Sequence, residues 1–123
     1  MLPVAGVRFA VGYEPMKAHV DLSIFSSPTD SFGMASGDVE FELLPRIGEA
    51  VSFGHPIVDR TVALPALAGF AFQLKVESVI HAPTGASFGV ILMLEDVVLQ
   101  DAAQSLALAD YLERGFGLDV DRF

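Results

Sequence analysis

The sequence predicts a mainly β domain of the α+β class: a small, strongly bent antiparallel sheet or small barrel, completed by one C-terminal amphipathic helix. Between residues 7 and 99, short stretches alternate apolar and polar residues with the two-residue period of half-buried strands. Glycine and proline separate these stretches, and a helical period follows over residues 101–115. We therefore expect about five to seven strands and one helix.

The length of 123 residues suits a single domain over residues 1–123, since such a chain buries about two-thirds of the surface it exposes when unfolded. Cysteine is absent, which excludes disulfides, thiolate metal sites and a cysteine nucleophile, and suits a reducing compartment. The longest apolar run, residues 90–94, is far shorter than the roughly 18 residues of a membrane-spanning helix. The first residues also lack the pattern of a secretion signal. We expect a cytoplasmic protein with no membrane partner.

The hydrophobic content and the net charge of the chain favour some classes of partner and disfavour others. Hydrophobic residues make up 52% of the chain and its mean hydropathy is +0.51, which favours a homo-oligomer, most simply a dimer, that buries the excess apolar surface. The net charge is −9, from 16 acidic and 7 basic residues, so the phosphate backbone of a nucleic acid would be repelled. The same charge would attract a basic protein partner.

The first strand candidates are short and are followed by a polar stretch. Apolar residues alternate over residues 7–11 and again over residues 20–24. Residues 26–37 contain four Ser, two Gly, a Pro, a Thr and an Asp, which predicts a mobile surface loop.

Residues 38–43 form the clearest alternating strand in the sequence. Its apolar face holds Val39, Phe41 and Leu43. Its other face is an acidic column: Asp38, Glu40 and Glu42. We interpret this column as a solvated edge that discourages aggregation, with a binding surface for a basic partner as the alternative.

Turn and strand signals alternate through the middle of the chain. Residues 45–51 predict a turn into a strand that contains Val51 and Phe53, and residues 57–64 predict an edge strand. Residues 70–76 predict a more central strand, and the shift of its apolar phase predicts a bulge at Glu77 and Ser78.

The next strand should lie at the centre of the sheet. Residues 88–94 have almost no polar member, so both faces of this strand should be covered, and residues 82–86 supply a hairpin loop before it. Residues 97–99 suit either a continued strand or an early helix start.

The helix has a defined start and end. Asp101 and Gln104 match a capping box, and Gly115 and Gly117 end the helix. At about 100° per residue, one face should pack on the sheet: Ala102, Ser105, Leu108, Ala109, Leu112 and Phe116. The opposite face should be solvated: Gln104, Asp110, Tyr111 and Arg114.

The turn over residues 45–51 and the long bent strand over residues 76–81 resemble small uncharacterised bacterial β-barrel proteins of the SH3-like type. The resemblance covers residues 38–99. It implies a bent sheet or SH3-like barrel and no particular activity, because unrelated functions share such barrels.

Three histidines are the candidates for chemistry. His19 and Asp21 share a strand face, but a zinc site needs three or four convergent ligands, so we expect no metal and no other cofactor. His55, close to Asp59, could act as an acid or base, and so could His81 at a strand end. A turn residue in water and a capped strand end are the simpler interpretations.

No sequence motif identifies a reaction. A serine-nucleophile elbow, a phosphate-binding loop and a dinucleotide fingerprint are all missing. Three functions stay open. We favour a non-enzymatic, self-associating acidic domain for binding or regulation. The alternatives are a small-molecule-binding barrel or modest enzyme that uses His55 or His81, and an acidic immunity- or inhibitor-type protein that neutralises a basic partner.

Overall fold

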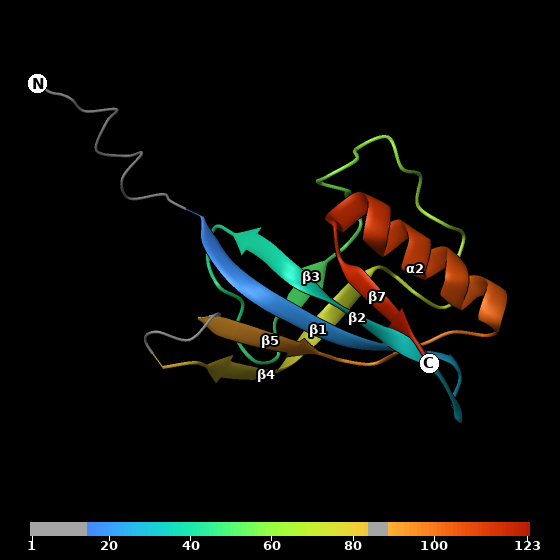
Figure 1. Ribbon diagram of the computed structural model, residues 1–123, viewed down its shortest axis with the longest axis horizontal. Coiled ribbons are helices and arrows are strands. Elements are labelled where there is room, and N and C mark those ends of the chain that lie inside the picture. The colour runs from blue at the N-terminus through green and yellow to red at the C-terminus, as the bar shows by residue number, and fades with distance from the viewer. Residues whose placement is uncertain (1–14, 84–88) are drawn as a thin grey trace, which may run out of the picture.

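One twisted sheet dominates the fold, and a single helix packs against one of its faces in the part of the chain that the structure describes (Figure 1). The structure is a computed structural model, and it describes residues 15–83 and 89–123. The elements in chain order are β1 (Met16–Ser27), β2 (Asp30–Phe41), β3 (Ala50–Ser52), β4 (Gln73–His81), β5 (Val90–Leu94), β6 (Val97–Val98), α2 (Ala102–Phe116) and β7 (Asp119–Arg122). The predicted class, mainly β with one C-terminal helix, is confirmed.

The sheet is open and mixed rather than a closed antiparallel barrel. Its strand order is β3-β4-β5-β1-β2-β7, and β6 also pairs with β1. Neighbouring strands in the sequence pair antiparallel, as β1 with β2 and β4 with β5. β5 and β6, however, run parallel to β1. Local signals predict the β4–β5 hairpin, but this parallel pairing joins distant parts of the chain, so no local pattern indicates it.

The prediction of a mobile loop over residues 26–37 is wrong. Only Pro28 and Thr29 separate β1 from β2, and β2 continues through this stretch. Its small residues have a packing reason. A Cβ at Gly33 would collide with the backbone oxygen of Asp121 in β7, and a Cβ at Gly37 would lie 2.9 Å from a Leu118 methyl carbon. Glycine within a strand here marks the close approach of another backbone.

Three further expectations change in the middle of the chain. Residues 57–64 form no strand; instead the N–H groups of Ile57 and Val58 both donate to the carbonyl of Gly115, at 2.8 Å. β4 begins at Gln73, directly after Phe72, whose φ of 59° is left-handed. Residues 97–98 prove to be strand. Residues 7–11 and much of the 82–86 loop lie outside the described residues.

The bulge in β4 and the helix cap are both confirmed. The pairing register of β4 with β5 shifts between Val76 and Ser78. At the helix start, the Gln104 N–H donates to Asp101 Oδ1 at 2.8 Å, and the Gln100 N–H donates to Gln104 Oε1 at 3.2 Å. Gly117, at φ 69°, ends the helix in the left-handed conformation that glycine adopts without strain.

The core lies between the sheet and α2, which contacts β1, β2 and β7. Alternate residues of β1 point into it: Ala18, Val20, Leu22 and Ile24. Tyr111 belongs to this core, so its predicted place on the solvated helix face is wrong, and Ala102 of the predicted packed face is exposed instead. None of the described helices is long and apolar enough to cross a membrane.

An aromatic cluster joins α2 to the segments around β3 and β4. The ring of Phe53 meets Phe116 edge-on with 5.0 Å between centroids, and Tyr111 meets Phe72 at 5.4 Å. The Tyr111 hydroxyl donates to the carbonyl of Phe53. Edge-to-face rings and a satisfied buried hydroxyl fix the end of the helix against the sheet.

Candidate functional site

A cleft of about 1000 Å³ lies where β1 begins and β2 ends. Met16 of β1 and Phe41 of β2 line one side of it, and β3 lines the other. The loop that joins β2 to β3 contributes Leu43 and Leu44. β2 and β3 are not neighbours in the sheet, and residues of both line the cleft.

Apolar side chains line this cleft and remain partly exposed to solvent. The exposed fractions are 46% for Met16, 78% for Leu43 and 49% for Ile57. Leu43 was expected on the apolar face of a strand, but β2 ends at Phe41 and leaves Leu43 in the open. Large apolar side chains gathered in a concave surface are typical of a binding site.

Buried core residues form part of the cleft lining. Val51, Phe53 and Phe116 all contribute to it and are nearly inaccessible. A molecule in the cleft would therefore contact the aromatic cluster that fixes α2. Occupancy of the cleft and packing of the helix are physically linked through these side chains.

Two of the polar residues that line the cleft, Arg46 and Glu49, bond to each other. The Arg46 N–H donates to Glu49 Oε1 at 2.6 Å, and the Arg46 guanidinium lies 3.4 Å from Glu49 Oε2. The hydrogen bonds from the Arg46 backbone and side chain lower the pKa of Glu49. Glu40, Ser52 and His55 complete the polar lining. A bound molecule would thus meet Glu40 and His55 as the polar side chains of the described lining that have no hydrogen bond of their own.

In the part of the chain that the structure describes, no hydrogen bond or ion pair joins the three residues suggested for catalysis. His55 lines the cleft and is exposed. The Asp59 carboxylate instead accepts hydrogen bonds from the hydroxyl and the N–H of Thr61, and both lower the pKa of Asp59. His81 lies exposed at the end of β4, opposite Val90 of β5. Within residues 15–83 and 89–123, no hydrogen bond joins a histidine to a hydroxyl group.

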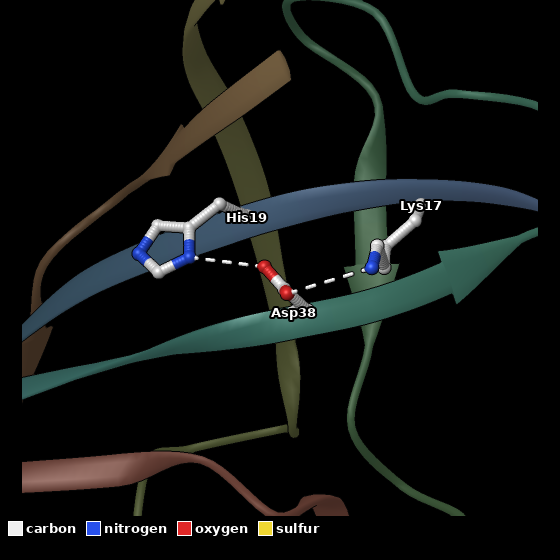
Figure 2. Close-up of polar contacts among 3 residues, drawn as sticks. All are labelled: Lys17, His19 and Asp38. Atoms are coloured by element: carbon white, nitrogen blue, oxygen red, sulfur yellow. Dashed lines mark hydrogen bonds and ion pairs between the residues drawn. The ribbon is translucent and has the colours of Figure 1, made fainter. Parts of the chain in front are cut away.

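The predicted acidic column is shorter than expected and is partly neutralised. Asp38 and Glu40 lie in β2, but Glu42 follows the end of the strand. Figure 2 shows the Asp38 carboxylate between two side chains of β1, with His19 Nδ1 at 3.2 Å and Lys17 Nζ at 3.9 Å. The pairing of β1 with β2 brings them together, which the spacing within either strand alone does not reveal. Exposed pairs of this kind stabilise little.

The outer face of the sheet, defined here as the face opposite α2, holds further carboxylates. The registers place Asp21 beside Ser36, which is paired with Asp119 on β7. Apolar side chains share this face: Met34, Ile80, Ile91 and Met93. No group of three or more His, Asp or Glu side chains in the described ranges is arranged to hold a metal ion.

Comparisons with protein-family models, with curated proteins and with solved structures gave no match.

Proposed function

We propose that this protein is a non-enzymatic binding domain whose cleft takes an apolar ligand or an apolar segment of a partner. The observation that carries the proposal is the cleft of about 1000 Å³ in which Met16, Leu43 and Ile57 stay partly exposed. Self-association of the domain belongs to the proposal and is supported by the 52% hydrophobic composition. A cytoplasmic location also belongs to it, supported by the absence of cysteine.

The energetics favour an apolar occupant over a charged one. Burying a large aliphatic side chain contributes about 1.5–3 kcal/mol. Within the described lining, Arg46 and Glu49 pair with each other and Glu40 is the one other charged acid or base, so most of the lining offers a charged ligand no opposite charge. The volume is also at the upper end of the range of about 300–1000 Å³ found for ligand pockets.

Binding of the uncharged dye Nile red tests this proposal. Ile57→Asp should weaken saturable dye binding about tenfold, because the cleft then loses apolar area and gains a charge. The matched control is Leu106→Asp on α2. Leu106 is 47% exposed, close to the 49% of Ile57, but unlike Ile57 it does not line the cleft. Equal losses in both variants, or no saturable binding by the unchanged protein, would refute the cleft as a binding site.

A second candidate, binding of a basic protein, is favoured by the acidic outer face. Asp21, Asp38 and Asp119 share that face, and of these Asp38 contacts Lys17 and the His19 imidazole. Immobilised basic proteins such as histones serve as the probe. The amount of this protein captured by the immobilised basic protein should decline steeply as the salt concentration rises. The double variant Asp21→Asn, Asp119→Asn should bind more weakly than the unchanged protein at low salt. Capture that is insensitive to salt would contradict an electrostatic partner.

A further inference from the structure

The two edges of the sheet differ in how they are protected. The β7 edge is short and carries Asp119, Asp121 and Arg122, which are charges of the kind that keep edge strands from pairing. The other edge is formed by β3 and by the end of β4 that extends beyond it. Within residues 15–83 and 89–123, β3 and the turn before it pair with β4 as far as Val76, so residues 78–80 of β4 form an edge that carries no charge.

Hydrogen bonds on both sides of the bulge show which backbone groups this edge presents. The backbone N–H and C=O groups of Val76 point toward β3, since the N–H donates to the carbonyl of Glu49 and the C=O accepts from the N–H of Gly48. The backbone N–H of Ala82 points toward β5, since it donates to the carbonyl of Gly89, the residue just before β5. Backbone direction alternates along a strand, and the bulge accounts for the extra residue. Val79 and His81 therefore turn their N–H and C=O groups away from β5.

We propose that a second copy of this chain pairs with this edge, antiparallel and across a two-fold axis at Ile80. In this register Val79 of each copy lies opposite His81 of the other, so the four outward backbone groups of each copy all find partners. If the two-fold axis passed through Val79 instead, only the N–H and C=O of Val79 would find partners, and those of His81 would not. The backbone pattern thus selects one alignment.

The side chains agree with this register. Ile80 is 46% exposed, and the two-fold axis places it beside the same residue of the second copy. Ile80 pairs with Ile91 of β5, so a row of four isoleucines would cross the joined sheets on their outer faces. Glu77 is the nearest carboxylate in β4 and lies at the far end of the paired stretch, which keeps the two copies' acidic groups apart.

The proposal rests on the self-association included in the proposed function, and two measurements separate them. Light scattering of the unchanged full chain reports self-association alone. Ile80→Cys reports the interface, because the chain contains no other cysteine. The two Cα atoms across a non-hydrogen-bonded pair are about 4.5 Å apart, within the range for a disulfide. The control is Leu106→Cys on α2, with an exposed fraction of 47%.

The expected results are a reversible dimer of the unchanged chain and a disulfide-linked dimer of Ile80→Cys that forms at least tenfold faster than that of Leu106→Cys. Ile80→Lys should shift the chain to monomer, whereas Leu106→Lys should not. A dimer that survives Ile80→Lys, with no preferential crosslink at position 80, would overturn the interface and leave self-association standing. A monomer at every concentration up to about 100 μM, well above a typical micromolar Kd, would overturn both.

Discussion

The Tyr111 hydroxyl connects α2 to the segment that follows β3. It is buried, it donates to the Phe53 carbonyl, and its ring contacts both Phe72 and Phe116. Phe53 and Phe116 also line the cleft. A single side chain therefore links the helix, the β3 segment and the candidate binding site.

Replacing Tyr111 with Phe should lower the free energy of unfolding by about 1–3 kcal/mol, because the buried Phe53 carbonyl loses its donor while the ring contacts remain. Urea unfolding measures this change. Ser31→Ala removes an exposed hydroxyl and should change the stability by less than about 0.5 kcal/mol. Equal effects of the two substitutions would contradict a structural role for the Tyr111 bond.

Alkaline pH should destabilise the protein through the same side chain. Burial raises the pKa of Tyr111 above its ordinary value of 10.0. As the pH rises past about 10, an unfolded tyrosine ionises while the folded one keeps its proton, so stability falls with rising pH. Tyr13→Phe leaves Tyr111 as the sole tyrosine, and its tyrosinate absorbance should develop later than that of a free tyrosine. A normal titration of the folded protein would contradict this burial.

At the scale of elements, the glycines of β2 determine whether β7 can pair with it. Gly33→Ala should destabilise the protein by about 1–3 kcal/mol, because the new Cβ meets the Asp121 backbone oxygen and not a flexible side chain. Hydrogen exchange should show faster exchange in β7. Gly89→Ala is the control, since no atom of the described residues lies within 4 Å of its added Cβ. Unchanged protection of β7 in Gly33→Ala would contradict the close approach.

Elements with local signals were predictable from the sequence, and those defined by distant contacts were not. The Asp101 cap and the bulge after Val76 depend on residues a few positions apart, and the structure confirms both. The small residues around Gly33 favour a loop when only the local sequence is considered, because β7, which requires them to be small, lies at the other end of the chain. Tyr111 was placed in solvent because its partner, Phe53, is far away in the sequence.

The same distinction applies to the candidate site. The sequence indicated His55, which lines the cleft, and the acidic residues Asp38 and Glu40, of which Glu40 lines it. It did not predict the cleft, because the walls come from β1, β2, β3 and the start of the irregular segment after them. The sequence offered one signal, the apolar residue Ile57. In the structure its N–H and that of Val58 bond to the carbonyl of Gly115 near the helix end, so Ile57 belongs to no strand and lines the cleft.

At the scale of the whole molecule, charge should oppose self-association. Each copy carries a net charge of −9, so two copies repel one another at low ionic strength. Raising the salt concentration shortens the screening length to about 10 Å at 0.1 M and should strengthen the dimer, whereas a complex with a basic protein should weaken. Sedimentation equilibrium over a salt series measures this. A dimer that dissociates as salt rises would indicate an interface held by opposite charges.

The central position of β1 also governs how the chain reaches this fold. Its partner β2 follows after two residues, but β5 and β6 join it only after more than half of the chain has intervened. Loop-closure entropy makes the first pairing fast and the second slow, and parallel pairing raises the contact order. The β1–β2 hairpin should therefore form early, and docking of the β4–β5 hairpin along β1 should limit the folding rate.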